Sequence, residues 1–174
     1  MRKSLREDKH RIVFVHDASG LFAGAPLNIP GKHYTTPKVI EEVKDRHSSL
    51  LLQFALNSGK LEVIEPQGKY FRKVEEEAKR IGEIVALSNT DISVIALALE
   101  LKDKGYDVVV VTDDYAVQNT VLHLGIEFLS TKTIGIKKMV RYQVYCPVCG
   151  WEGVTSLKIC PRCESALKRK PAKS

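Results

Sequence analysis

Four cysteines near the end of the chain have the spacing of a zinc site. They form two Cys-Pro-x-Cys pairs separated by ten residues: Cys146, Cys149, Cys160 and Cys163. Each pair can wrap one side of a metal ion, and four thiolates complete the tetrahedral shell that Zn²⁺ prefers. Two disulfides are the alternative, but secreted disulfide frameworks are usually cysteine-dense, and these cysteines all fall within eighteen residues. The pattern predicts one structural zinc ion, with no open position for activating water.

Acidic residues follow both of the clearest expected strands. Asp17 comes just after the apolar run 12–15, and Asp113 and Asp114 come just after the valine-rich run 107–112. Because open parallel sheets place functional groups beyond the carboxyl ends of their strands, these acids could share one cleft. Like charges held close together repel unless divalent cations lie between them. Such a cluster therefore predicts Mg²⁺ or Mn²⁺ bound by oxygen ligands.

Two further acids are expected on helices. Asp91 begins a helix after the cap cluster 88–90, and Glu42 lies one turn into a helix opened by Pro37. Each acid also has an ordinary explanation, since a carboxylate at a helix start favours the macrodipole and Glu42 can pair with Arg46. Taken singly, the acids are more often structural than catalytic. Their combination favours a metal-binding cleft.

Strands alternate with helices along the main part of the chain. The expected strands are residues 12–15, 61–65, 107–112 and 125–129, and the expected helices are residues 36–57, 69–87, 92–104 and 113–124. This order predicts an α/β fold with a central parallel sheet flanked by helices on both sides. We expect a main domain over residues 1–131, a linker over 132–140, and a small β-rich zinc ribbon over 141–174, in which residues 168–174 form a disordered basic tail.

Charge is divided unevenly along the chain. Residues 1–131 carry 17 lysines and arginines against 19 acids, a net charge of −2, whereas residues 132–174 carry ten against two, a net charge of +8. A near-neutral body with a basic end suggests an anionic polymer as partner, because clustered lysine and arginine release counterions from phosphates. The alternative is that the positive charge serves solubility alone. The embedded ribbon favours nucleic acid.

Composition excludes several classes of protein. A hydrophobic fraction of 44% in 174 residues is enough for one packed domain with a small satellite. The N-terminus lacks the apolar stretch of a signal peptide, and no run approaches the ~18 apolar residues of a membrane span. We therefore expect a soluble, cytoplasmic protein without a membrane partner. The absence of GxGxxG, P-loop and GxSxG motifs weighs against dinucleotide cofactors, nucleotide hydrolysis and serine hydrolases.

Four segments resemble the acidic motifs of PIN-domain nucleases, which are metal-dependent ribonucleases on a small parallel sheet. The segments are His16-Asp-Ala-Ser19, Pro37-Lys-Val-Ile-Glu-Glu-Val43, Asn89-Thr-Asp-Ile-Ser-Val-Ile-Ala96 and Val111-Thr-Asp-Asp-Tyr-Ala-Val-Gln-Asn119. A PIN domain followed at once by a four-cysteine ribbon is similar to one family, the endonuclease that trims the 3′ end of precursor small-subunit ribosomal RNA in archaea and eukaryotes. The resemblance covers roughly residues 11–167 and suggests the compact, archaeal-like form.

The resemblance implies a three-layer PIN fold and a set of catalytic acids. Asp17, Glu42, Asp91 and one or both of Asp113 and Asp114 would bind Mg²⁺ or Mn²⁺, with Asp114 preferred within the pair. Cleavage would leave a 5′-phosphate and a 3′-hydroxyl. His16 departs from the apolar residue usual before the first acid, and we expect it to turn away from the metal.

The implied partners are precursor small-subunit ribosomal RNA and the immature small subunit, while the oligomeric state stays open. The predicted RNA-binding residues are Lys137, Lys138, Arg141, Trp151, Lys158 and Arg162. They would hold the RNA backbone, so specificity would rest on RNA shape and unpaired bases. Trp151 can equally be a ribbon core residue. The alternatives are a non-catalytic RNA-binding assembly factor, a toxin-like PIN ribonuclease, and a ribbon adaptor that contacts protein.

Overall fold

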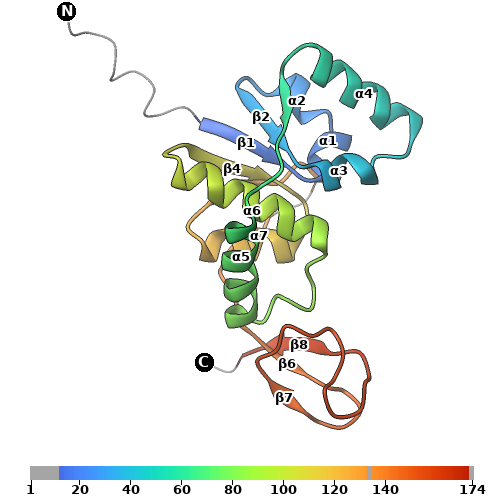
Figure 1. Ribbon diagram of the computed structural model, residues 1–174, viewed down its shortest axis with the longest axis vertical. Helices are drawn as coiled ribbons and strands as arrows, with labels where there is room; N and C mark the ends of the chain where they lie inside the picture. The colour runs from blue at the N-terminus through green and yellow to red at the C-terminus, as the bar shows by residue number, and fades with distance from the viewer. Residues whose placement is uncertain (1–11, 133–134, 173–174) are drawn as a thin grey trace, which may run out of the picture.

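The main domain is built on a sheet of five parallel strands. A computed structural model describes residues 12–132 and 135–172 (Figure 1). The strands are ordered β3-β2-β1-β4-β5. Their bounds are β1 Ile12–His16, β2 Lys32–Thr35, β3 Leu61–Val63, β4 Asp107–Val111 and β5 Glu127–Leu129. β1 and β4 contribute the buried valines at the centre of the core, including Val13, Val15 and Val110. The prediction of a central parallel sheet is confirmed.

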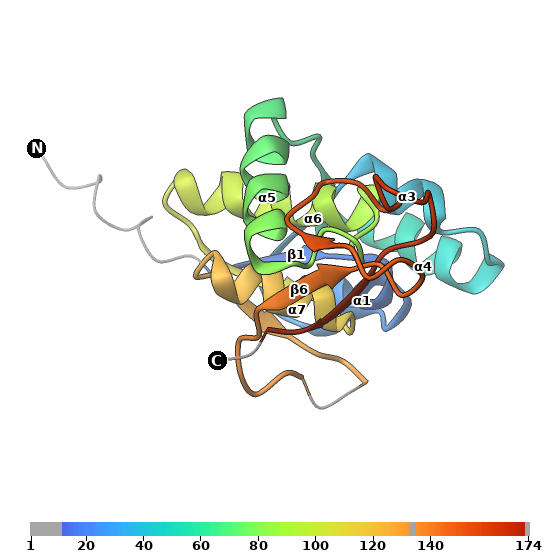
Figure 2. The same cartoon turned by 90° about the horizontal axis from the view of Figure 1, so that it is seen from below.

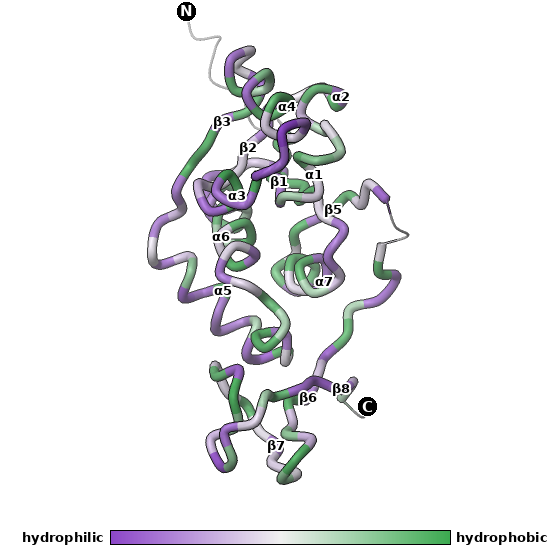
Figure 3. The backbone as a smooth tube through the Cα atoms, turned by 90° about the vertical axis from the view of Figure 1, so that its right-hand side faces the viewer, coloured by the Kyte–Doolittle hydropathy of each residue, from purple (hydrophilic) through white to green (hydrophobic). Residues whose placement is uncertain are grey.

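Helices cover both faces of this sheet. Their bounds are α1 Ala18–Phe22, α2 Ala25–Asn28, α3 Pro37–Glu42, α4 Arg46–Asn57, α5 Gly68–Ile81, α6 Asn89–Asp103 and α7 Tyr115–His123. α1 packs on β1 and on α4, whereas α6 packs on β1, β4 and the outer helix α5. Residues 92–101 of α6 are all buried because α6 lies between the sheet and α5. In Figure 3, α5 is largely purple, as expected of a helix whose outer face meets water.

Several element predictions are wrong in detail. The helix expected over 36–57 is two helices, because Val43 is extended and Asp45 starts a new helix by accepting a hydrogen bond from the Ser48 amide. The helix expected over 69–87 ends at Ile81, where Gly82 takes a left-handed conformation with φ 77°. Strand β2 and the short helices α1 and α2 were not predicted. Among the described residues, none of the helices has the length and apolar character needed to span a bilayer.

The ribbon is a three-stranded antiparallel sheet in the order β7-β6-β8. Its strands are β6 Tyr142–Tyr145, β7 Glu152–Gly153 and β8 Lys168–Pro171. The expected disorder of residues 168–174 is therefore wrong for β8, whereas 173–174 lie outside the described residues. The charged side chains of β8 have partners: Arg169 stacks on the Tyr142 ring and Lys170 pairs with Glu152. Such pairing lets a very polar segment form an edge strand.

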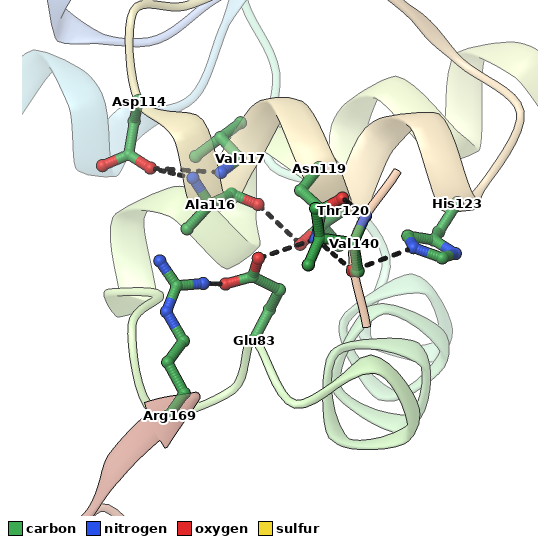
Figure 4. A network of polar contacts seen from close by, with 9 residues as sticks. All are labelled: Glu83, Asp114, Ala116, Val117, Asn119, Thr120, His123, Val140 and Arg169. Atoms are coloured by element: carbon green, nitrogen blue, oxygen red, sulfur yellow. Dashed lines mark hydrogen bonds and ion pairs between the residues drawn. The ribbon is translucent and has the colours of Figure 1, made fainter. Parts of the chain in front are cut away.

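The ribbon docks on the main domain at the end of α5 (Figures 1 and 2). Gly82 lies against the backbone of Tyr142, so closely that a side chain at position 82 would collide with it. Val85 packs against the apolar cluster of the main domain and against that of the ribbon. Glu83, only 1% exposed, forms an ion pair with Arg169 of β8. It also accepts a hydrogen bond from the side-chain amide of Asn119 at 2.7 Å (Figure 4).

The connection between the domains is also fixed to the main domain. Asn119 of α7 donates to the Val140 carbonyl and accepts from the Val140 amide, at 2.7 and 2.8 Å. Gln118 accepts a hydrogen bond from the Ile136 amide at 3.0 Å. The part of the predicted linker that the structure describes beyond residue 134 therefore runs along α7 rather than hanging free.

The docking ion pair gives a prediction about stability. Arg169→Met should destabilise the protein by about 3–5 kcal/mol, because it leaves the Glu83 carboxylate buried without a countercharge. Adding Glu83→Gln should recover part of this loss, because a neutral amide can stay buried and bonded to Asn119. Urea unfolding measures both effects.

The matched control is Lys73→Met, which removes an ion pair with Asp103 whose side chains are 53% and 43% exposed. Its cost should stay below about 1 kcal/mol. Equal losses for Arg169→Met and Lys73→Met would mean that the ribbon pair does not hold the domains together.

Candidate active site

Asp17 lies at the carboxyl end of β1, directly beside the end of β4. The two strands are parallel neighbours with His16 opposite Val111, and the Asp17 amide donates to the Val111 carbonyl at 3.3 Å. One carboxylate oxygen of Asp17, Oδ1, accepts from the Ser19 hydroxyl at 2.7 Å and from the Gly20 amide at 2.9 Å. Asp17 is thus the N-cap of α1 and is also held at the sheet edge.

The environment of Asp17 disfavours its negative charge. Burial raises the pKa of the Asp17 carboxyl, while hydrogen bonds from Thr112, Ser19 and Gly20 act in the opposite direction. Within the described residues, no lysine or arginine forms an ion pair with this carboxylate. A bound cation would supply the missing positive charge.

Asp91 lies in the first turn of α6, where it completes a capping box with Ser88. The Ser88 amide and hydroxyl each donate to Oδ2 of Asp91 at 2.7 Å, and the Asp91 amide donates back to the hydroxyl at 3.1 Å. Burial is the main cause that raises the pKa of Asp91, and the negative charges of Asp114 and Asp17 raise it further. Asp91 is therefore close enough to Asp17 and Asp114, both far away in sequence, to be affected by their charges.

The adjacent acids Asp113 and Asp114 have different surroundings. Both oxygens of Asp113 accept hydrogen bonds from the segment after β5, from the hydroxyls of Ser130 and Thr131 and the amides of residues 131 and 132. Although burial opposes them, these bonds hold the pKa of Asp113 well below its usual range. Asp113 thus anchors a loop.

Asp114 is the better candidate for the metal-binding acid. It is the N-cap of α7, where Oδ1 accepts from the amides of Ala116 and Val117 at 2.7 and 3.1 Å. The other oxygen of Asp114 accepts no hydrogen bond within the described residues. The negative charge of Asp114 raises the pKa of Asp91. The geometry supports the preference for Asp114 within the pair.

Glu42 lies at the exposed end of α3. It borders a shallow pocket of about 330 Å³, together with Asn89 and Thr90 from the first turn of α6. The start of α3 is tied to the next turn of α6, since the Thr36 and Ser93 hydroxyls are 2.8 Å apart. Glu42 therefore lies beside the helix start that carries Asp91, in a pocket that Lys38 and Lys44 also line.

The acids are less tightly gathered than the cysteines. Among the described residues, only the four cysteines form a group of three or more potential metal-binding side chains whose ligand atoms all lie within 4.8 Å of one another. This arrangement fits the tetrahedral zinc site, and the cysteines are not joined as disulfides. That the acids share one cation stays a prediction. The donor set nevertheless fits Mg²⁺ or Mn²⁺, because Asp17, Asp91 and Asp114 offer hard oxygen ligands with mutually unfavourable charge.

His16 and His33 form a buried pair beneath Asp17. Nε2 of His16 lies 2.8 Å from Nδ1 of His33, and Nε2 of His33 lies 2.9 Å from the Ile29 carbonyl. Since that carbonyl only accepts, His33 carries its proton on Nε2 and accepts from His16. Burial and the neighbouring His33 lower the pKa of His16 to about 3. His16 is a neutral core residue that packs beside Gly20, as expected of a side chain turned into the interior.

The predicted RNA-binding residues divide into two groups. Lys137, Lys138, Arg141 and Arg162 are exposed. Trp151 instead packs in the ribbon cluster. Lys158 is exposed as well, but its ammonium donates to the Leu87 carbonyl of the main domain at 2.7 Å. Glu83, Asn119 and Arg169 were not predicted as functional residues from the sequence; the polar Gln118-Asn119 pair within an apolar helix was the available signal.

Comparisons with known proteins agree with this geometry. Residues 14–101 match the family model of the PIN domain of ribonuclease, the class that the fold and the strand-end acids define. The chain is 42% identical to an endoribonuclease Nob1 from Pyrococcus abyssi over 163 residues, covering 92% of this chain and 95% of the relative. It is 37% identical to an endoribonuclease Nob1 from Methanocaldococcus jannaschii over 170 residues, covering 93% and 79%.

A third relative, a ribonuclease VapC3 from Aeropyrum pernix, is 40% identical over 116 residues, covering 67% of this chain and 84% of the relative. The chain belongs to the Nob1 family of PIN-domain endoribonucleases. The predictions of a PIN-type fold, of an endoribonuclease and of a nuclease with a four-cysteine ribbon are confirmed.

The two neighbouring acids give a matched pair of variants. Asp114→Asn should reduce RNA cleavage at least about 100-fold, because a neutral amide is a poor ligand for a divalent cation. Asp113→Asn should leave cleavage within about threefold and lower the melting temperature, because an amide cannot accept all four loop hydrogen bonds. Cleavage assays and thermal unfolding on both variants test this assignment, and the reverse pattern would contradict it.

Proposed function

We propose that this chain is a divalent-metal-dependent endoribonuclease that cleaves the 3′ end of precursor small-subunit ribosomal RNA. The observation that carries the proposal is that Asp17 and Asp114 follow the carboxyl ends of the adjacent parallel strands β1 and β4, with Asp91 near enough for their negative charges to raise its pKa. Relatives named endoribonuclease, aligned over 92% and 93% of this chain, support endonucleolytic cleavage. The order of the acidic motifs and the trailing ribbon, which resemble the family that trims this RNA, support the choice of substrate.

Asp17, Asp91 and Asp114, with Glu42 at the rim, would hold Mg²⁺ or Mn²⁺. Such ions lower the pKa of bound water and neutralise charge that builds on the scissile phosphate. In-line attack of water on the phosphorus would break the P–O3′ bond and leave a 5′-phosphate and a 3′-hydroxyl.

The rest of the site orients these carboxylates. The Ser19 hydroxyl fixes one oxygen of Asp17, and the Ser88 amide and hydroxyl fix one oxygen of Asp91. The first amides of α7 fix one oxygen of Asp114. Each acid thus has one restrained oxygen before an ion binds, which reduces the rearrangement that binding requires.

Removing one of these charges should separate cleavage from binding. Asp17→Asn and Asp91→Asn should each reduce cleavage at least about 100-fold while RNA affinity changes less than about twofold, because the acids act on the phosphate only through the ion. Asp45→Asn, at the exposed N-cap of α4, is the control and should cleave normally. Full cleavage by both active-site variants would refute the assignment.

The substrate is tested with a short RNA that carries the small-subunit 3′ junction and a scrambled RNA of equal length. We expect cleavage at one position of the first RNA only, in added Mn²⁺ or Mg²⁺ and not in their absence. Equal cleavage of both RNAs would favour a toxin-like ribonuclease. No Mn²⁺ binding to the full chain at millimolar concentration would favour a non-catalytic assembly factor.

The ribbon would hold part of the RNA. Cys149→Ser should lower RNA affinity severalfold, because loss of one thiolate opens the zinc shell and loosens the ribbon. Fluorescence anisotropy at several salt concentrations measures this, and wild-type affinity should fall steeply with salt. Wild-type affinity in the variant, or a flat salt dependence, would instead point to a ribbon that contacts protein.

A further inference from the structure

The ribbon forms an ion pair and a hydrogen bond with the segment that precedes α6, the helix that carries Asp91. This segment, residues 82–88, joins α5 to α6 and is folded on itself, with the amides of Ala86 and Leu87 donating to the Glu83 carbonyl. Ribbon residues contact it at both ends: Arg169 pairs with Glu83 and Lys158 bonds to Leu87. The segment is therefore clamped between α5 and the ribbon.

The contact at Leu87 lies one peptide unit from the site. Leu87 is fully buried, and its carbonyl accepts a hydrogen bond from the Lys158 ammonium at 2.7 Å. The same peptide unit carries the Ser88 amide, which donates to Oδ2 of Asp91 at 2.7 Å. A peptide unit is planar, so fixing its carbonyl also fixes the direction of its amide. Lys158 and Asp91 are thus joined by hydrogen bonds to the two sides of the Leu87–Ser88 peptide unit.

The contact at Glu83 reaches a second acid. Glu83 bonds to Asn119 of α7, and α7 begins at its N-cap Asp114, as Figure 4 shows. Asn119 lies little more than one turn along a rigid helix from Asp114. The ribbon therefore contacts the supports of both Asp91 and Asp114, and among the described residues no ribbon side chain bonds to either carboxylate.

We propose that Lys158 and Arg169 are positioning residues for the nuclease site. In this arrangement the zinc ribbon orients the Ser88 amide and with it Asp91, in addition to any hold on RNA. The proposal builds on the proposed function in one respect, the catalytic role of Asp91. It also reassigns Lys158 from an RNA contact to a contact between the domains.

The test is Lys158→Met in the full chain, which keeps the aliphatic stem and removes the ammonium. Lys158→Arg keeps a donor and should restore wild-type behaviour. Lys170→Met is the matched control, because its ammonium pairs with Glu152 inside the ribbon. Three quantities are measured on each variant: the single-turnover cleavage rate at saturating RNA, the RNA dissociation constant without added Mg²⁺ or Mn²⁺, and amide hydrogen exchange of residues 88–92.

Lys158→Met should lower the cleavage rate about tenfold, since small displacements of a catalytic group are costly. Its RNA dissociation constant should change less than about twofold, and exchange at residues 88–92 should accelerate while α4 exchanges as in the wild type. Unchanged exchange at residues 88–92 would overturn the proposal, as would a weaker RNA affinity with an unchanged rate. The exchange readout needs no activity, so a wild type that fails to cleave would count against the proposed function while exchange still decides the positioning role.

Discussion

The parallel pairing of β1 with β4 is the constraint on which the site depends. Both strands end in the same register, so the chain must turn away from the sheet at Asp17 and at Thr112 side by side. At each turn the backbone needs acceptors for the free amides of the helix that follows, and a short acidic side chain is a good N-cap. Asp17 and Asp114 meet this local need and also bring two negative charges to one edge of the sheet.

The capping role and the metal-binding role of the acids do not exclude each other. A capping carboxylate uses one oxygen for the helix amides and leaves the other for a second partner. Asp91 follows the same rule, because both bonds from Ser88 reach a single oxygen. Asp113 is the instructive exception: both its oxygens accept bonds from the loop after β5, so this acid has a partner without an ion. Counting bonded oxygens thus separates the two neighbours better than their place in the motif does.

The sequence predicts the centre of the fold and the site better than their periphery. The valine run of β4 and the apolar run of β1 identify their strands because burial on both faces leaves only apolar residues. Strand β2, Lys32–Thr35, has no such signal, since its polar side chains are buried by partners distant in sequence, as His33 is by His16. The break after α3 depends on one capping side chain, that of Asp45, inside a run of helix formers.

The contacts between the domains could not be predicted, for a physical reason. Glu83 reads as a surface acid after a helix-ending glycine, and Arg169 reads as part of a basic tail. Glu83 is a buried charge and Arg169 is the partly buried partner that compensates it, so neither local propensity nor periodicity identifies the pair. Apolar contact at Val85 alone would allow the ribbon to dock in several orientations, because such contacts have no direction. The ion pair and the Lys158 hydrogen bond are directional, and they select the one orientation in which the ribbon supports the helix of Asp91.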